Sequence, residues 1–543
     1  MVFARRSTTL LAAIIASCAM VLSLTACTSD NKTVVDGQTT VTSNSAGGMA
    51  VFTPSNGITL NQQTPLNKWA KLVPDLTKAL VDAGFKKGDI NHTTSDSLDK
   101  QSRAIQDFVV DHLSNNTTDD SGIAIAPDNM TLLVAPVVEA DASTRQYGDY
   151  VSQNLSTNDV TDEGATSDGE SSEDDSSKDD SSNTESDSTA SDEQAQAVDR
   201  LVSSLKLAKE SGMHVVLLGN SIEGYKPDAF VKFSDAQTIG KLQAEKMVSK
   251  LKLDKASKDN PKYIEVLLPY TAMDEKGNAN DSTFAQEAFR GIWQVLGSYY
   301  QKGVVESPSG TLDGKSTEND WQAVAYDAAK EGSTAKVLDK RLAKTDGQST
   351  LTRIDGIITM NDYIASEVVK ELDDLGYTGS AADINPQITI SGIVGNITGK
   401  KDLSRDAVPD PIKSPENDNA NDSSSSDDDA DKDTSASDKD RDSQWPLVTG
   451  YGAYVSNIPS IVNGKQWMTG MEDRQTIATD IAQACAKLNK DEALNSMPSI
   501  RNSEVGGVKK IPTISEPLLA VSASNLKSAL IDPGYISLAD AGL

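Results

Sequence analysis

Histidine, cysteine and acidic side chains carry out much of enzyme catalysis, and in this chain they are scattered. The three histidines, His92, His112 and His214, lie far apart in the sequence. His112 falls within a helical pattern, and His214 adjoins an apolar run predicted to be a buried strand. The sequence contains no paired metal-ligand motif, no phosphate-binding glycine loop and no nucleophile elbow. We therefore predict that the chain is not an enzyme and uses no metal or cofactor.

One acidic segment has spacing that suggests calcium chemistry. Asp429, Asp431, Asp433 and Asp440 follow one another much as the ligands of an EF-hand loop do. However, Thr434 stands where the turn glycine belongs, and no amphipathic helices flank the segment. The better interpretation is a solvated insert in which like charges repel one another.

The N-terminal segment has the layout of a secretory signal. Arg5 and Arg6 precede an apolar stretch from Leu10 to Leu24, shorter than the roughly 20 residues that span a bilayer. The stretch ends in "LTAC", which resembles a bacterial lipobox. That resemblance implies removal of residues 1–26 and lipid attachment to Cys27, which would anchor the chain at the extracellular face of the cell membrane. A soluble secreted protein and an uncleaved anchor are the alternatives.

The residues that follow the leader are predicted to be a flexible tether, 27–48, because serine, threonine, asparagine and glycine dominate them. With Cys27 carrying lipid, Cys485 is the last free thiol, so no intrachain disulfide can form in the mature chain. Cys485 lies in a helical apolar pattern and is predicted to be a small buried core residue.

The formal net charge of −30 is unevenly distributed. Two acidic runs, 156–193 and 414–443, carry roughly two thirds of it and are too poor in apolar residues to form a core. We predict disordered inserts at 156–195 and 414–443. An acidic surface repels phosphate, which argues against nucleic acid as a partner.

Outside these runs, short apolar runs alternate with segments of helical spacing. The predicted strands are 49–54, 131–138, 213–220, 262–270 and 354–362, with either 387–395 or 445–453 supplying the next one. The predicted helices are 66–85, 98–113, 197–212, 239–251, 282–300, 321–332 and 363–376, and Pro74 marks an alternative start for the first. Continuous apolar strands are buried on both faces, so the pattern predicts parallel sheets covered by helices.

The alternation restarts in the middle of the chain, which predicts an α/β fold of two doubly wound parallel-sheet lobes. In such sheets ligands bind beyond the carboxyl ends of the strands. Two lobes joined by a hinge can close on a ligand.

Three segments, 231–248, 353–379 and 449–469, resemble type I periplasmic binding proteins, in particular the sugar-binding branch that includes the xylose-binding proteins. Segments 99–109 and 511–535 agree with it. The resemblance implies two α/β lobes joined by a three-stranded hinge. It also implies a monomer that captures a ligand, expected to be a mono- or oligosaccharide, and delivers it to an ABC permease.

The resemblance also sets domain boundaries. They are an N-lobe at 49–235, a C-lobe at 236–465, a return to the N-lobe at 466–510 and a crossover to the C-lobe at 511–543.

Matched residue by residue, the resemblance implies nine ligand-binding positions. They are Lys68, Trp69, Asn220, Ser234, Asp235, Arg290, Asn361, Asp362 and Tyr451. An aromatic face such as that of Trp69 suits the C–H side of a sugar ring, while hydroxyl groups take charged or amide partners. If Asp362 binds ligand, replacing it by alanine is expected to weaken binding more than it lowers stability.

Several positions depart from the xylose-binding pattern. Gly219, Asn220 and Ser221 stand where Tyr-Asp-Arg is found, Tyr451 changes a Gly-Gln-Asp-Ala loop, and Glu472 replaces a lysine. Lost charged groups remove charge-assisted bonds, which are roughly twice as strong as neutral ones. The pattern therefore leaves open a different or larger ligand. A sensing or interaction lipoprotein with a degenerate sugar pocket is the alternative function.

Each candidate also has a purely structural interpretation. Trp69 has the helical spacing of a core residue, and Arg290 suits a surface salt bridge. Asn361 and Asp362 suit the cap of the following helix. Tyr451, between glycines, suits an exposed loop.

Overall fold

The computed structural model describes residues 32–35, 38–41, 45–55, 65–115, 125–138, 144, 146–151, 153–156, 185–273, 280–328, 330–343, 351–381 and 445–543. They form two units, 1–45 and 46–543. Within the segment predicted to be a tether, β1 (Lys32–Val35) and β2 (Gln38–Val41) pair antiparallel. The leader, Cys27 and the run 414–443 lie outside the described residues. Among those residues, no helix has the length and apolar character needed to span a membrane.

The N-lobe contains a seven-stranded sheet in the order β17-β18-β9-β7-β5-β3-β4. Its strands are β3 (Gly48–Pro54), β4 (Ile90–Ser95), β5 (Met130–Val134), β7 (His214–Leu218), β9 (Ala229–Lys232), β17 (Ile500–Val505) and β18 (Val508–Ser515). Neighbouring strands run parallel except in the β17–β18 hairpin. The first strand, β3, has β4 on one side and β5 on the other, so the sheet is doubly wound.

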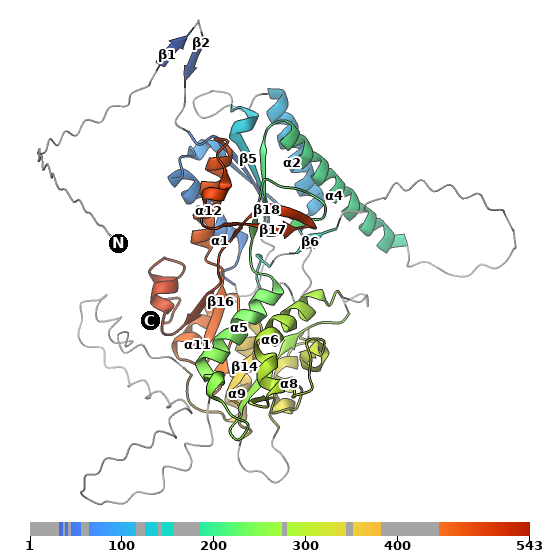
Figure 1. Cartoon of the computed structure of the whole chain (residues 1–543), viewed down its shortest axis with the longest axis vertical. Coiled ribbons are helices and arrows are strands. Elements are labelled where there is room, and N and C mark those ends of the chain that lie inside the picture. The colour runs from blue at the N-terminus through green and yellow to red at the C-terminus, as the bar shows by residue number, and fades with distance from the viewer. Residues whose placement is uncertain are drawn as a thin grey trace, which may run out of the picture. The chain divides into compact units, whose positions relative to one another are not determined.

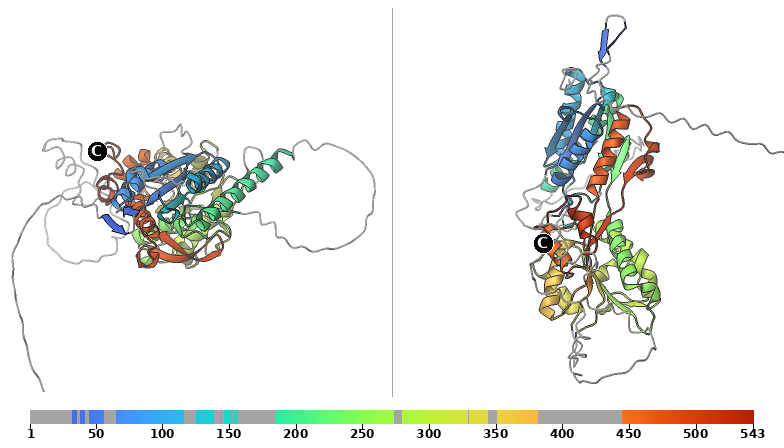
Figure 2. Two further views of the ribbon diagram at one scale, coloured as in Figure 1. Left: turned by 90° about the horizontal axis from the view of Figure 1, so that it is seen from above. Right: turned by 90° about the vertical axis from the view of Figure 1, so that its left-hand side faces the viewer.

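Helices cover both faces of this sheet (Figures 1 and 2). On one face α1 (Trp69–Asp82) packs beside α12 (Arg474–Leu488), and on the other α2 (Leu98–Asn115) packs beside α4 (Glu185–Glu210). Cys485 lies in α12 and is free and fully buried, as predicted. Burial raises the pKa of its thiol to about 12.

Two helices differ from their predicted starts. α1 starts at Trp69 and contains Pro74, since the apolar stripe of the helix packs against α12 on both sides of the proline. α4 starts at Glu185, inside the segment 156–195 predicted to be disordered. Glutamate, glutamine and alanine at 193–195 favour helix and extend it beyond its packed part. Residues 157–184 lie outside the described residues.

The C-lobe contains a four-stranded parallel sheet in the order β12-β10-β14-β15. Its strands are β10 (Lys262–Val266), β12 (Val305–Glu306), β14 (Gly356–Ile358) and β15 (Leu447–Val448). Of the two segments proposed for the strand after β14, 445–453 supplies β15, and 387–395 lies outside the described residues.

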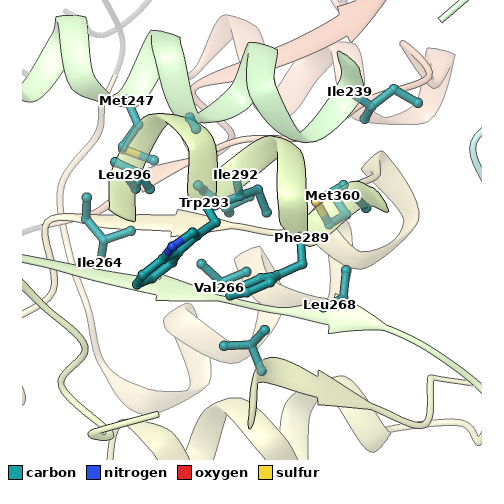
Figure 3. Close-up of a cluster of buried hydrophobic side chains, with 14 of the residues drawn as sticks. Ile239, Met247, Ile264, Val266, Leu268, Phe289, Ile292, Trp293, Leu296 and Met360 are labelled. Carbon is teal, nitrogen blue, oxygen red and sulfur yellow. The ribbon is translucent and has the colours of Figure 1, made fainter. Parts of the chain in front are cut away.

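Two helix pairs cover the C-lobe sheet. α5 (Ala236–Leu251) and α6 (Thr283–Gln301) pack on one face, where α6 side chains such as Phe289 and Ile292 lie over Ile264 and Val266 of β10 (Figure 3). α8 (Ser333–Arg341) and α9 (Asp362–Leu375) pack against a second cluster that includes Ile357 of β14.

The helix predicted over 321–332 is wrong. α7 (Trp321–Val324) is a single turn, and β13 (Ala325–Tyr326) follows it directly. β13 pairs in parallel with β11 (Leu268–Pro269). Pairing with a strand more than fifty residues away outweighs the local helix preference, as tertiary context often does.

Three chain crossings connect the two lobes. They lie between β9 and α5, between β16 (Met468–Met471) and α12, and between β18 and β19 (Leu519–Ser522). β16 and β19 pair antiparallel. The fold class predicted from the sequence, two doubly wound α/β lobes, is confirmed. β18 continues to Ser515, past the boundary placed at residue 511.

The remaining elements are short. They are the 3-10 turns Lys87–Asp89, Pro127–Asn129, Leu253–Lys255, Val455–Asn457 and Leu494–Ser496, the helix α11 (Ile458–Val462), the parallel pair β6 (Asn154–Leu155) and β8 (Ser221–Ile222), and a π turn at Lys527–Ile531.

Candidate functional site

Two of the crossings meet at a buried carboxylate, Glu472, which directly follows β16. Its Oε1 accepts hydrogen bonds from the Ser234 backbone N–H at 2.7 Å, from the Ser234 hydroxyl and from the Tyr451 hydroxyl at 3.3 Å. The Ser234 and Tyr451 hydroxyl oxygens also lie 2.7 Å apart. Ser234 follows β9 and Tyr451 follows β15, so Glu472 connects segments of both lobes. Burial raises the pKa of Glu472 to about 7.

Two of the predicted ligand residues cap helices. Asp235 accepts hydrogen bonds from the Thr238 backbone N–H at 2.8 Å and the Thr238 hydroxyl at 2.6 Å, at the start of α5. Asn361 caps α9 by accepting from the Ile364 N–H at 2.9 Å. The Asn361 amide also donates to Gln146 Oε1 of the N-lobe at 3.1 Å, so this cap makes a contact between the lobes.

The first residue of α9, Asp362, is fully buried and bonded to donors of the C-lobe. Its Oδ1 accepts from Gln466 Nε2 at 2.7 Å, and its Oδ2 accepts from the Thr469 hydroxyl and the Tyr454 N–H, each at 2.9 Å. Burial raises its pKa to about 6, although these donors oppose the shift. The carboxylate therefore stabilises the fold around the α9 N-terminus.

The predicted N-lobe pair also has internal partners. Lys68 Nζ lies 2.8 Å from Asp149 Oδ1. Trp69 is buried, with its ring edge-to-face against Tyr150 at 5.1 Å and Phe233 at 6.0 Å between centroids. This placement agrees with the structural interpretation from the sequence, in which Trp69 is a core residue.

The last two candidates lie apart from this network. Asn220 accepts from the Gln153 N–H at 3.0 Å and donates to the Pro136 carbonyl at 2.9 Å, which connects two loops of the N-lobe. Arg290 forms an ion pair with Glu287 one turn earlier on α6, with 39% of its side chain exposed. This matches the surface salt bridge considered from the sequence.

Replacing Arg290 by alanine is expected to change the free energy of unfolding by less than about 0.5 kcal/mol, because exposed ion pairs contribute little. Arg474→Ala is the matched control, since the Arg474 side chain is buried and bonded to Asp75 at 2.7 Å. Urea unfolding of both variants measures the difference. A loss for Arg290→Ala equal to that for Arg474→Ala would contradict a surface role.

Residues 146–151, here called the bridging segment, were missed from the sequence. Tyr147 is 1% exposed and packs in the C-lobe core, with its ring centroid 4.7 Å from that of Phe284 on α6. Three residues later, Tyr150 stacks on Phe233 in the N-lobe core at 4.7 Å. The segment therefore inserts one tyrosine into each lobe.

Gly148 allows the bridging segment to turn between its two tyrosines. It has φ +95°, and a Cβ there would lie 2.6 Å from the Asn67 carbonyl oxygen. Only glycine combines this conformation with so close an approach. A glycine between two tyrosines, "YGDY", was the sequence signal available for this feature.

A pocket of about 480 Å³ opens on the C-lobe, where β11 and β13 end. Its lining residues are Tyr270, Ala272, Met273, Trp321, Gln322, Ala325, Tyr326, Asp327 and Lys330. None of them was predicted as a site residue. The available signal was an aromatic residue at the end of each short strand. Among the described residues, no cluster of three or more His, Cys, Asp or Glu side chains could hold a metal ion.

Solved structures align with most of this chain at low identity. One is an ABC transporter solute-binding protein from Clostridium phytofermentans with bound β-D-glucose, at 17% identity over 91% of this chain and 99% of its own, with a TM-score of 0.45. Another is a carbohydrate transporter solute-binding protein from Chloroflexus aurantiacus in complex with D-glucose, at 18% identity over 92% and 98%, with a TM-score of 0.43. An arabinose-binding protein from Geobacillus stearothermophilus shows 10% identity over 89% and 99%, with a TM-score of 0.41.

No family model and no curated protein matches this chain. Solute-binding proteins are the class that the sequence resemblance predicted. The two-lobed α/β fold itself follows from the strand order and the three crossings described above.

Proposed function

We propose that this chain is an extracellular, lipid-anchored solute-binding protein that captures a sugar between its lobes and delivers it to an ABC permease. The observation that carries the proposal is the convergence of polar residues from both lobes: Ser234 and Glu472, each in a chain crossing, and Tyr451 of the C-lobe. Crossings of a few residues can act as a hinge for two packed lobes. The lipobox-like sequence at Cys27 supports retention at the membrane.

Ligand binding would compete with contacts inside the chain. In the described state Asn361 is bonded to Gln146, and Tyr147 packs on Phe284. A sugar that enters between the lobes must replace these contacts. The difference between its affinities for the state with these contacts and the state without them sets how far the population shifts.

A second function, a sensing or interaction lipoprotein without a transport role, is favoured by two buried tyrosines that make contacts between the lobes. Tyr147 and Tyr451 are nearly or fully buried between the lobes. In this case the ligand site is degenerate, and the protein presents a fixed surface to a partner.

A thermal-shift screen of the mature chain against mono- and oligosaccharides distinguishes the two functions. At a hundredfold excess over its Kd, a sugar is expected to stabilise the chain by about 2.7 kcal/mol and to raise Tm accordingly. Arg290→Ala is the control variant and should show the same shifts. An unchanged Tm with every sugar would overturn sugar capture and leave the second function.

A further inference from the structure

We propose that the bridging segment, 146–151, is an autoinhibitory element that covers the interlobe site and must detach before a solute binds there. This inference rests on the proposed function and concerns the regulation of the same site. Lys68, Trp69, Asn361 and Tyr451, all implied by the resemblance as ligand positions, each contact the bridging segment. The chain therefore occupies, with its own residues, partners that a solute would need.

On the N-lobe side, one carboxylate of the bridging segment holds both Lys68 and Trp69. Asp149 Oδ1 accepts from the Lys68 ammonium at 2.8 Å, and Asp149 Oδ2 accepts from the Trp69 backbone N–H at 3.0 Å. The Tyr150 hydroxyl donates to the Lys68 carbonyl. Because charge-assisted hydrogen bonds are the stronger ones, Asp149 is the main polar attachment of the segment to the N-lobe.

On the C-lobe side, Gln146 and Tyr147 attach the segment. The Asn361 amide donates to Gln146 Oε1 at 3.1 Å, and the Tyr454 hydroxyl donates to the Gln146 carbonyl at 2.7 Å. The Tyr147 ring centroid lies 6.3 Å from that of Tyr451. The bridging segment therefore engages ligand positions of both lobes at the same time.

The bridging segment is held by side chains and not by secondary structure. Its residues form neither a helix nor a strand, and two of its backbone N–H groups donate to the carbonyls of Thr144 and Asn67. It lies in the long connection between β5, which ends at Val134, and α4, which begins at Glu185. Connections of this length are uncommon in compact domains, and many of them are functional. A segment that pairs with neither sheet can detach while both lobes remain folded.

The seated segment leaves a buried donor unsatisfied. Asn67 is 1% exposed, and a Cβ on Gly148 would lie 2.8 Å from the Asn67 Cβ. Within the described part of the chain, the Asn67 Nδ2 has no hydrogen-bond partner. A buried donor without an acceptor destabilises the state that contains it. A solute that brings an acceptor to this amide is therefore favoured over the segment.

Hydrogen exchange of the unmodified mature chain without ligand tests whether the segment detaches. The amides of 146–151 are expected to exchange faster than the buried amides of α12, because they open locally and do not wait for global unfolding. Exchange of 146–151 at the α12 rate would show that the segment is a permanent part of the core. That result would overturn the inference, whatever the chain binds.

Asp149→Ala tests whether the segment competes with a solute. The variant is expected to raise exchange of 146–151 about tenfold, the effect of losing one charge-assisted bond. Apparent affinity is proportional to the fraction of chains whose site is free. In calorimetric titrations with D-glucose, D-xylose and cellobiose, any sugar that binds should therefore bind more tightly by the same factor.

Asp228→Ala is the matched control. Asp228 directly precedes β9, pairs with Lys209 at 2.8 Å and accepts from the Val215 N–H at 2.8 Å, with 26% of its side chain exposed against 18% for Asp149. It reproduces the ion pair and the backbone contact of Asp149 without touching the bridging segment. Asp228→Ala should change neither the exchange of 146–151 nor the sugar affinity.

The inference and the proposed function fail in different ways. Unchanged or weaker sugar binding by Asp149→Ala would show that the segment does not compete with the sugar, which overturns the inference and leaves sugar capture standing. A sugar that binds Asp149→Ala more tightly than the unmodified chain supports both. Local detachment of 146–151 in a chain that binds no sugar, with or without Asp149, supports the covering segment and overturns sugar capture.

Discussion

Replacing Asp362 by alanine is expected to lower the free energy of unfolding by about 4 kcal/mol, because it leaves three buried donors without their acceptor. These donors are Gln466 Nε2, the Thr469 hydroxyl and the Tyr454 N–H. The structure thereby reverses the expectation from the sequence, in which ligand affinity would fall more than stability. Urea unfolding of the mature chain at pH 7.5 measures the effect.

A matched control for this variant is Asp235→Ala, which removes the cap of α5. In the described hydrogen bonds, Asp235 accepts from the backbone N–H and the hydroxyl of Thr238. It also forms an ion pair with Lys232 at the surface. Its loss is expected to lower stability by about 1 kcal/mol. If Asp362→Ala lowered stability no more than Asp235→Ala does, the buried network would not be holding the α9 N-terminus, and a ligand role would become the better explanation of Asp362.

The sequence was informative about the strands of both lobes. The predicted strands 131–138 and 213–220 contain the apolar runs 132–138 and 215–218, and the structure places β5 and β7 in the middle of a parallel sheet. The sequence was less informative where pairing with a strand distant along the chain determines the local structure. The β13 strand forms because β11 lies beside it, and local helical spacing at 321–332 carries no trace of that pairing.

The candidate site shows the same contrast between what the local sequence indicates and what contacts between distant residues determine. Ser234 and Tyr451, whose hydroxyl oxygens lie 2.7 Å apart, are both positions that the resemblance implied for ligand binding. The resemblance did not show that they bond to each other and to Glu472. Ser234 and Glu472 are 238 residues apart, and neither residue type reveals the other as its partner. The bridging segment escaped for the same reason, because Tyr147 meets Phe284 only in the folded chain.

Glu472 is expected to make the chain less stable as pH rises from 5 to 8. Burial raises its pKa from 4.5 to about 7. Between these values the native state retains a proton that the unfolded chain has released, so stability is highest at low pH and falls as pH rises through this window. The fall is roughly 3 kcal/mol, at 1.36 kcal/mol for each unit of the pKa difference. Asp362, whose pKa is raised to about 6, adds a fall of the same sign at lower pH.

Glu472→Gln tests this directly, because the glutamine side chain keeps an acceptor for Ser234 and Tyr451 but does not titrate. Urea unfolding at pH 5, 6, 7 and 8 is expected to show that most of the fall between pH 6 and 8 disappears in this variant. Glu492→Gln is the control, since Glu492 is exposed, pairs with Lys487 and has a lowered pKa. It should leave the profile of the unmodified chain almost unchanged. A Glu472→Gln profile parallel to that of the unmodified chain would show that Glu472 is ionised throughout this range. The contact between Ser234, Tyr451 and Glu472 would then be a charged one, with Asp362 or another buried acid responsible for any pH dependence.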